Sequence, residues 1–415
     1  MKLACVIHRF GADIAGGSEA HCRAIALNLA MRHDVTIVTT CSRDHVTWRN
    51  EYPAGPSEDG PLRVLRFPVV RTRSMQRFRA ISEIVFAGGA SEADQERWFV
   101  ENGPEAPALL EHLQRTDYDR VVFWSYRYYQ TFFGLPLVAD RSLIVPTAEE
   151  DPLIRLGILE RFFALPRGFI FLTPEEEALI APHRAEPLAP SCIIGSGLAP
   201  VEPHASVPLE PLGIRIPYVL YLGRIDPNKG CDTLLRQFIR FRSRGVSDAQ
   251  LVMAGPANMR LRDDPSIVYP GFVSDATRET LLTNASVLVV PSPYESLSLV
   301  LLEAWNHGVP ALVNGRCSVL KGQALRANGA LYYHHFEEFA TCLAYLLRHP
   351  DVARQLGRQG RSYVDREYRW PAVMEKLERF LERVPAGGQP AGATPGGQRA
   401  EKASSTLPGV PLNSA

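Results

Sequence analysis

The sequence predicts an α/β protein with two doubly wound parallel-sheet domains that face each other across a cleft. Short apolar runs alternate with amphipathic stretches along most of the chain, which is typical of a parallel sheet covered by helices on both faces. A proline-rich interval at 197–217 divides this alternation into two series, as an interdomain linker does. The chain of 415 residues is also longer than one hydrophobic core ordinarily serves.

The first series predicts an N-terminal domain over residues 1–196. Its first apolar run, 2–8, leads through a glycine turn to a helix expected over 18–32, where apolar residues recur at helical spacing. Ligands of such sheets bind at the carboxyl ends of the strands, so a site is expected between the domains. The remaining strands are expected at 34–40, 118–125, 142–147, 168–173 and 191–195.

The second series predicts another α/β domain over 218–365, with helices between its strands. A last helical stretch is expected over 366–384. Residues 385–415 are rich in Gly, Pro, Ala and Ser and contain few large apolar side chains, so this tail is expected to be disordered. The strands of the second domain are expected at 218–223, 250–255, 266–271, 286–292 and 309–314.

Composition excludes several classes of protein. Lys plus Arg and Asp plus Glu both number 45, so the chain lacks the basic excess of a general nucleic-acid binder. The seven cysteines include no CxxC pair, which indicates reduced thiols in a cytoplasmic protein rather than a zinc site or a disulfide framework. No apolar stretch reaches the length that spans a membrane.

The segment PSPYESLSLVLLEAWNHGVP, residues 291–310, predicts a short helix between a strand and a turn. Ser296 or Ser298 can cap the start of this helix, and Gly308 can end it in the left-handed conformation. The free amides at the helix start would then form an anion site suited to a phosphate.

Two acids stand along this helix. Glu295 precedes the helix start, and Glu303 lies about a turn and a half inside it. The amides of Ser298, Leu299 and Val300 lie between them, and eight residues of helix span roughly 12 Å. Each glutamate also has an interpretation without a functional role. Glu295 would then be a solvated turn residue, and Glu303 a partly buried acid bonded to neighbouring backbone.

A second signal is the loop YLGRIDPNKGCDTLL, residues 221–235. A strand ends at Gly223, the turn carries Arg224 and Lys229, and Gly230 opens a helix. Two cations on one loop at the carboxyl end of a strand can clamp a diphosphate. Alone, they would be solvated surface charges; with the helix start at 298 they favour a cleft.

Together, GRIDPNKG and PSPYESLSLVLLEAWNHGVP resemble the retaining glycosyltransferases of the GT4 type ("glycosyl transferases group 1"). The resemblance runs from about Tyr218 to Leu381. It implies the GT-B fold, with two Rossmann-like domains facing across a cleft and a last helix crossing back to the first domain. It also implies a metal-independent enzyme of polysaccharide biosynthesis. Such an enzyme moves a sugar with retention from a UDP or GDP sugar to a glycan, lipid-linked or small-molecule acceptor.

The resemblance implies roles for the matching residues. Arg224 and Lys229 would bind the donor diphosphate and stabilise the leaving group, and Glu295 would bond the donor sugar; these three are the catalytic candidates. The amides at Ser298 and Leu299 would hold the distal phosphate, and a ribose would bond Glu303. The donor-binding candidates are therefore Gly16, Gly17, Gly223, Arg224, Lys229, Glu295, Ser298, Leu299 and Glu303.

The N-terminal half matches less completely. Gly16 and Gly17 lie between the first strand and a long helix, as in the family, where their backbone could approach the donor phosphate or the acceptor. The alternative is a simple turn at the start of the helix. Glu19 and His21 are either acceptor contacts or, more plainly, an exposed capping glutamate and a partly buried histidine.

One departure concerns the strand in the middle of this domain. Many relatives carry a histidine after it, near the donor sugar, whereas VVFWSYRYYQT (121–131) has aromatic residues and Arg127. Glu149 and Glu150 could supply polar groups to the cleft or simply be charges at a helix N-terminus.

Residues 60–82 contain six arginines and no acid, with apolar side chains interleaved. This segment, Arg63–Arg79 above all, could dock on anionic lipid at the cytoplasmic face of a membrane. The alternative is a solvated loop and helix face. Two further alternatives concern the whole protein: an inactive nucleotide-sugar-binding relative, and a Rossmann-type dehydrogenase, which the lack of a GxGxxG motif disfavours.

Overall fold

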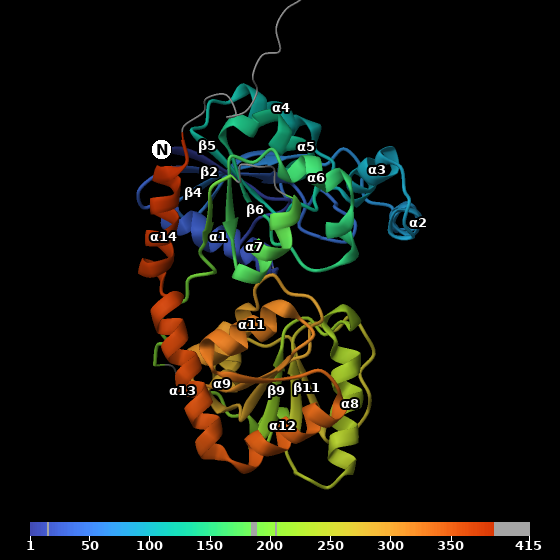
Figure 1. Ribbon diagram of the computed structural model, residues 1–415, viewed down its shortest axis with the longest axis vertical. Helices are drawn as coiled ribbons and strands as arrows, with labels where there is room; N and C mark the ends of the chain where they lie inside the picture. Colours follow the sequence, from blue (N-terminus) through green and yellow to red (C-terminus); the bar gives the residue numbers. More distant parts are fainter. Residues whose placement is uncertain (15, 184–188, 204–205, 386–415) are drawn as a thin grey trace, which may run out of the picture.

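The computed structural model describes residues 1–14, 16–183, 189–203 and 206–385. Two α/β domains follow each other along the long axis of the molecule, and each has a central sheet with helices on its faces (Figure 1). The predicted fold class, two parallel-sheet α/β domains, is confirmed. Of the tail expected at 385–415, all but Pro385 lies outside the described residues.

The first domain is built on an eight-stranded sheet in the order β3-β4-β2-β1-β5-β6-β7-β8. Its neighbouring strands are parallel, except that β3 pairs antiparallel with β4. The six strands expected from the sequence are all present: β1 (Lys2–Val6), β2 (Asp34–Thr40), β5 (Arg120–Trp124), β6 (Ser142–Val145), β7 (Gly168–Phe171) and β8 (Ser191–Ile193).

The edge strands β3 (Gly55–Asp59) and β4 (Leu62–Phe67) lie outside the expected set. In β4 polar and apolar residues alternate, so that Leu62 and Val64 are buried while Arg63 is exposed. The arginine-rich segment 60–82 therefore begins as a strand, and its second half forms a helix, because its apolar residues cover the domain core.

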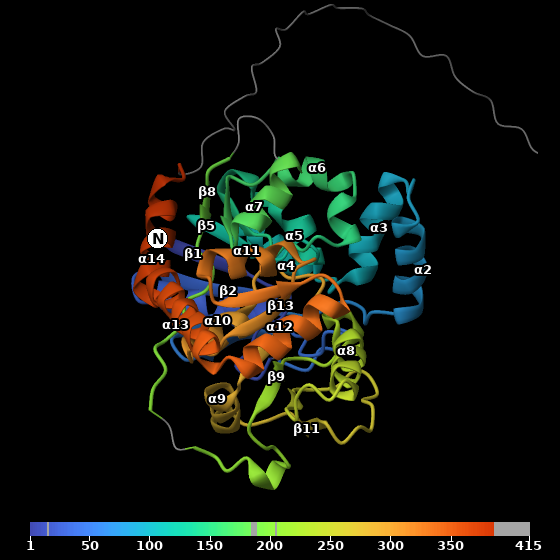
Figure 2. The same cartoon turned by 60° about the horizontal axis from the view of Figure 1, so that its bottom comes forward.

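The helices of the first domain cover both faces of its sheet. A pair of them, α2 and α3, stands out from the side of the domain (Figures 1 and 2). Ser74 and Ser91 cap this pair, since their hydroxyls accept hydrogen bonds from the amides of Arg77 and Asp94. The helices are α1 (Gly17–Leu29), α2 (Met75–Phe86), α3 (Glu92–Asn102), α4 (Pro107–Arg115), α5 (Tyr129–Gly134), α6 (Ile158–Phe163) and α7 (Pro174–Ile180).

The second domain is built on a six-stranded parallel sheet in the order β11-β10-β9-β12-β13-β14. Its first five strands match the expected ones, and β14 (Ala330–Tyr333) is additional. The others are β9 (Tyr218–Leu222), β10 (Gln250–Ala254), β11 (Ile267–Gly271), β12 (Val287–Val290) and β13 (Ala311–Asn314). Its helices are α8 (Cys231–Ser243), α9 (Asp275–Asn284), α10 (Leu299–Asn306), α11 (Ser318–Ala327), α12 (Phe336–Arg348) and α13 (Pro350–Glu367).

The last helix, α14 (Trp370–Arg383), lies against the first domain. Arg120 of β5 donates to the carbonyl of Val384 at 2.7 Å, directly after the helix end. The sequence suggests one helix from 366, but α13 continues to Glu367 and the chain breaks at Tyr368 and Arg369. The break places Pro371, which has no amide hydrogen to donate, in the first turn of α14.

The chain crosses between the domains twice, and the two crossings are bonded to each other. The amide of Leu198 donates to the carbonyl of Tyr368 at 2.7 Å, and Arg369 donates to the carbonyl of Ala199 at 2.9 Å. A methyl group at Gly197 would overlap the indole ring of Trp370. The crossings therefore form one narrow connection beside α13 and α14.

The seven cysteines are free thiols, five of them buried. Within the described residues, no helix combines the length and the apolar character needed to cross a membrane.

Candidate active site

The loop after β9 packs directly against the loop after β12. Gly223 (φ 137°) ends the strand, and a short 3-10 turn, Pro227–Lys229, leads to Gly230 (φ 74°) and α8. A methyl group at Gly230 would lie 2.5 Å from the carbonyl oxygen of Pro291, so only glycine allows this approach. The packing brings Lys229 beside the start of the segment 291–310.

Lys229 and Glu295 form an ion pair, with 2.9 Å between Nζ and Oε1. Burial lowers the pKa of Lys229, but Glu295 and then Glu149 of the first domain raise it more, so the net pKa lies above its ordinary value. The ammonium group is therefore charged and faces carboxylates from both domains. Arg224 is close enough to oppose that shift, which places both predicted cations in one region.

Helix α10 begins beside this pair. Of the two predicted caps, Ser298 takes the capping position, but its side chain makes no capping bond. Its hydroxyl is buried (residue 2% exposed) and has no hydrogen-bond partner among the described residues. The first amides of a helix also lack intrahelical acceptors. A polar hydroxyl and a helix N-terminus are thus available to an anion next to Lys229. Gly308 has the expected left-handed conformation (φ 71°).

Glu303 has a partner that the sequence analysis did not consider. Arg278 of α9 donates to Glu303 Oε2, whereas the bland alternative was a bond to neighbouring backbone. Burial raises the pKa of Glu303 and Arg278 offsets part of that rise, so the pKa stays above its ordinary value. Arg278 occurs in the segment that resembles the family, but its position on a helix gives no signal of this pairing.

The first domain contributes a buried network around Glu19. Its carboxylate accepts from Arg9 Nε at 2.6 Å, from Ser18 Oγ at 2.9 Å and from His8 Nε2 at 3.0 Å. Burial raises the pKa of Glu19, but His8 and Arg9 lower it far below its ordinary value. The alternative of an exposed capping glutamate is therefore wrong, because this side chain turns inward to Arg9 and His8.

This network explains one of the two glycines at the start of α1. A methyl group at Gly16 would overlap the Glu19 carboxylate, whereas one at Gly17 would meet no atom within 4 Å. Packing against Glu19 thus explains why residue 16 is a glycine. At Gly17 no described residue lies close enough to require one. Both glycines stand at the start of α1 on the first domain, whereas Lys229 and Glu295 stand on the second.

His21 is fully buried and uses both ring nitrogens. Nδ1 accepts from Trp124 Nε1 at 3.0 Å, and Nε2 donates to the carbonyl of Gly195 at 2.8 Å. Burial lowers its pKa to about 4, although the bond to Gly195 acts in the opposite direction. These bonds tie α1 to β5 and to the first crossing, so both ring nitrogens of His21 are used within the protein.

Arg127 occupies the place where the sequence analysis looked for a histidine. It donates to Asp151 at 2.8 Å and lies 3.7 Å from Glu149. Two non-glycine residues with positive φ, Ser125 (64°) and Thr147 (49°), precede these side chains, and such strain tends to collect at functional sites. The end of β5 therefore presents an arginine with carboxylates.

Sequence reasoning missed two side chains of the first domain. His8 directly follows β1 and stacks on Tyr128, with 3.7 Å between the ring centroids. His8 Nδ1 is buried without a hydrogen-bond partner in the described part of the chain. Their positions just beyond strand ends were the available signal.

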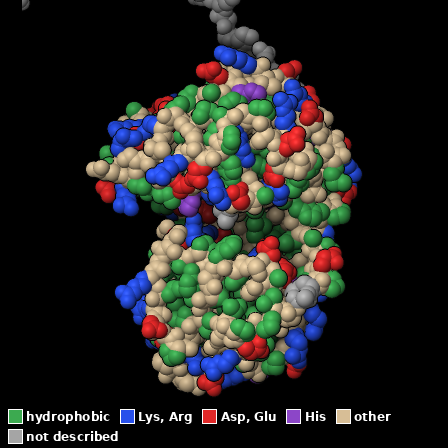
Figure 3. All heavy atoms as spheres, turned by 180° about the vertical axis from the view of Figure 1, so that it is seen from behind, with side chains coloured by type: hydrophobic (Ala, Val, Ile, Leu, Met, Phe, Trp, Pro, Cys, Tyr) green, Lys and Arg blue, Asp and Glu red, His purple; other side chains and the backbone are tan. Residues whose placement is uncertain are grey.

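The two half-sites face each other across a hollow between the domains. Figure 3 shows this hollow from behind, with charged and histidine side chains gathered at one end. On the first domain, burial lowers the pKa of His45, and Arg9 and Arg224 lower it further; Arg224 belongs to the second domain. A small crevice is lined by side chains of both domains: Ala148, Glu150, Glu175, Glu176, Leu179, Pro293, Tyr294, Glu295, Cys317, Ser318 and Val319.

Residues 216–349, which hold the loop of Lys229 and the whole of α10, match the family "Glycosyl transferases group 1". This match covers the second domain up to α12. The chain is also 29% identical to the alpha-maltose-1-phosphate synthase of Mycolicibacterium smegmatis, over 44% of this chain and 52% of that protein. It is 28% identical to a GDP-mannose-dependent alpha-(1-6)-phosphatidylinositol monomannoside mannosyltransferase of Mycobacterium tuberculosis, over 41% and 48%.

Another relative is an uncharacterised glycosyltransferase of Methanocaldococcus jannaschii, 32% identical over 28% of this chain and 31% of that protein. The chain thus spans about a third to a half of the length of the curated relatives it matches.

Solved structures resemble this protein over nearly its whole length. The sucrose-phosphate synthase of Thermosynechococcus elongatus has a TM-score of 0.68 at 18% identity, covering 92% of this chain and 99% of that one. The E. coli structure described as trehalose-6-phosphate bound with UDP-2-fluoro glucose has a TM-score of 0.68 at 11% identity, covering 93% and 100%. At these identities the likeness shows the fold, which is GT-B.

Proposed function

We propose that this protein is a retaining glycosyltransferase that moves a sugar from a nucleotide-diphosphate sugar to an acceptor. The observation that carries the proposal is the Lys229–Glu295 ion pair beside the uncapped start of α10, with Arg224 close by. Cations and helix amides at strand ends bind and neutralise a diphosphate. The match of residues 216–349 to the family, and a relative whose name specifies GDP-mannose, support this assignment.

In the proposed reaction, the donor diphosphate takes the place of Glu295 as the partner of Lys229. The released Glu295 then accepts hydrogen bonds from hydroxyls of the donor sugar. Lys229, Arg224, the Ser298 hydroxyl and the amides at Ser298 and Leu299 stabilise the negative charge that grows on the leaving diphosphate. These groups provide the neutralisation without a metal ion.

The acceptor hydroxyl would attack the face of the sugar that the diphosphate leaves, which retains the configuration and needs no nucleophile from the protein. Cleft closure would align the acceptor, since positioning alone supplies a large part of such a rate enhancement. Glu303 would accept from the ribose hydroxyls through its free oxygen, while Arg278 holds the other.

The acceptor is a glycan, a lipid-linked saccharide or a small molecule, and the proposed location is cytoplasmic.

Fewer arginines of the segment 63–79 are available to contact an anionic membrane than the sequence suggests, because most of them have partners within the protein. Arg66 stacks on Tyr52, and the remaining partnered arginines bond side chains or carbonyls: Arg71 with Glu101 and Glu105, Arg73 with Val46 and Asn102, and Arg77 with Glu101. Arg63 of β4 and Arg79 of α2 remain exposed, and α2 also carries the exposed apolar Ile84 and Phe86. Flotation with anionic vesicles at moderate salt tests this contact, and its absence would remove it.

A thermal-shift panel of UDP, GDP, ADP, CMP and dTDP, with NAD as control, tests the donor assignment. One nucleoside diphosphate is expected to raise the melting temperature because it binds only the folded protein. That result would direct a transfer assay with sugars on the same base. No shift with any nucleotide would contradict the assignment.

The second candidate is a nucleotide-sugar-binding relative without turnover. Arg127, ion-paired at the place of the family's histidine, is the observation that favours it. A protein that binds a nucleotide sugar but neither transfers nor hydrolyses it would support this candidate over the first.

A further inference from the structure

The first turn of α7 carries three side chains that bond to three different parts of the molecule. Thr173 caps the helix, and Glu175 and Glu176 follow Pro174. The proposed function uses none of them. Their partners lie on the loop after β6, on the loop before α10 and on α11 of the second domain.

Glu176 holds the loop after β6. Its side chain is buried (residue 1% exposed), with Oε1 accepting from the amide of Ala148 at 2.7 Å and Oε2 from the amide of Leu172 at 2.6 Å. A glutamate three residues after a threonine cap ordinarily bonds back to the amide of the cap itself. Here both oxygens reach instead to the ends of β6 and β7.

The loop that Glu176 holds is the one that faces the cleft. Ala148 follows the strained Thr147, and Glu149 comes next, within electrostatic reach of Lys229. Strained backbone persists only where its surroundings fix it, and the Glu176 bond to Ala148 does so. Burial raises the pKa of Glu176 to about 8, while the two amide bonds act against that rise.

Thr173 reaches the opposite wall of the cleft. Its hydroxyl accepts from the amide of Glu176 and donates to the carbonyl of Ser296 at 3.2 Å. Ser296 lies between Glu295 and Ser298, in the loop before α10. One hydroxyl therefore caps α7 and links the first domain to the proposed donor site.

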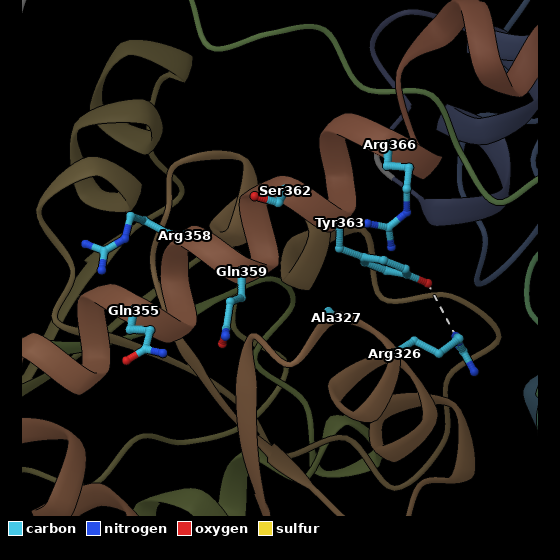
Figure 4. A pocket seen from close by; sticks show the side chains of 8 residues that line it. All are labelled: Arg326, Ala327, Gln355, Arg358, Gln359, Ser362, Tyr363 and Arg366. Atoms are coloured by element: carbon cyan, nitrogen blue, oxygen red, sulfur yellow. Dashed lines mark hydrogen bonds between the residues drawn. The ribbon is translucent and has the colours of Figure 1, made fainter.

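Glu175 fixes the same helix to the second domain. It pairs with both terminal nitrogens of Arg326, the Nη2–Oε2 distance being 2.9 Å. The Nε of Arg326 lies 3.3 Å from the hydroxyl of Tyr363 of α13 (Figure 4). A methyl group at Gly322 would overlap the Glu175 carboxylate, so α11 approaches α7 closely.

We propose that Thr173 and Glu176 are positioning residues for sugar transfer, which hold the loops 146–151 and 291–298 in register across the cleft. This inference rests on the proposed glycosyl transfer. A displacement of about 1 Å between reacting groups can lower a rate about a hundredfold, so two bonds that fix opposite walls matter to turnover.

The test compares full-length Glu176→Gln and Thr173→Val with the wild type. In Glu176→Gln one amide partner meets an NH₂ group instead of an acceptor, so hydrogen exchange at Ala148 or Leu172 should accelerate. We expect kcat to fall tenfold to a hundredfold, with the nucleoside-diphosphate Kd unchanged within threefold. Thr173→Ser, which keeps the hydroxyl, should restore most of the turnover that Thr173→Val loses.

The control is Glu160→Gln, the same substitution at an exposed position of α6, which should leave kcat and exchange unchanged. Wild-type kcat in both Glu176→Gln and Thr173→Val, with faster exchange, would overturn the inference and leave a purely structural role. If Glu176→Gln fails to fold, the comparison of Thr173→Val with Thr173→Ser tests the inference by itself. A wild type that binds no nucleotide and transfers no sugar contradicts the proposed function itself, which is a different result.

Discussion

Lys229 lies between carboxylates of both domains, at 2.9 Å from Glu295 and within electrostatic reach of Glu149. The side chains of Lys229 and Glu295 are 28% and 14% exposed. In the proposed function the donor diphosphate replaces Glu295 as the partner of Lys229. The pair therefore has two candidate roles, one in donor binding and one in folding.

Substitution of Lys229 by Ala separates these two roles. Removing a cation from the leaving group should lower turnover about a hundredfold to a thousandfold. The free energy of unfolding should change by about 1 kcal/mol or less. Transfer kinetics and urea unfolding measure both quantities, and a variant that unfolds without ligand would show a structural role instead.

Glu303 is tested by its nucleotide affinity. Glu303→Gln should weaken binding of the preferred nucleoside diphosphate about tenfold, since the ribose loses a charged acceptor. Glu279 is the matched control, because it is a second glutamate near Arg278. Equal affinities for wild type and Glu303→Gln by calorimetry would exclude the ribose role, and an equal loss in Glu279→Gln would trace the effect to Arg278.

His21 makes stability depend on pH. Its pKa is about 4 in the folded protein and 6.5 when unperturbed, so between these values the unfolded chain binds more protons. The free energy of unfolding should therefore fall by up to about 3 kcal/mol as the pH drops from 6.5 to 4. The difference between wild type and His21→Asn in urea titrations isolates this contribution, and a difference that does not vary with pH would contradict it.

At the scale of elements, two adjacent glycines at the start of α1 differ in whether the surrounding structure requires a glycine. Gly16 makes room for the carboxylate of Glu19, which the protein itself supplies. Around Gly17 a methyl group would meet no atom of the described residues within 4 Å, so these residues give no packing reason for glycine there. A ligand that approaches this turn would supply one.

Gly17→Ala tests that difference. Alanine is the better helix former, so stability should stay equal or rise by up to about 1 kcal/mol, while donor affinity or turnover falls at least threefold. Gly16→Ala should instead lower the melting temperature, because its methyl group overlaps Glu19. Full activity of a stable Gly17→Ala protein would show that Gly17 marks only the turn.

The elements differ in how far the sequence predicts them. Central strands such as β1 and β9 are buried on both faces and form continuous apolar runs, so they are recognised directly. The edge strand β4 alternates arginine with apolar residues, a pattern that a lipid-docking segment or a solvated basic loop would also show. The same edge effect hides β14, a short strand with an exposed tyrosine.

The residues of the candidate site also differ in how far the sequence predicts them. The loops around Lys229 and Glu295 are contiguous in sequence, and motif spacing predicts their approach. The partners Arg278, His8 and Arg9 come from other elements, and only the fold brings them to Glu303 and Glu19. Pairings between distant segments leave no trace in a single sequence, which is why the burial of Glu19 was missed.

At the scale of the whole molecule, the two crossings determine what holds the domains together. The segment 195–199 bonds to Tyr368 and Arg369, and α14 then returns to the first domain. The first domain is therefore assembled from both ends of the chain, with the second domain inserted between them.

This insertion predicts the behaviour of a cleaved chain. A protease cut between residues 199 and 217 would open only one of the two connections, and α14 would still anchor the remainder through its buried apolar face and the bond from Arg120. The nicked protein should elute as one particle in gel filtration and separate into two fragments only in denaturant. Separation under native conditions would contradict this expectation. The buried face of α14 thus makes the molecule a self-complementing pair of fragments, whose pieces could be expressed apart and recombined.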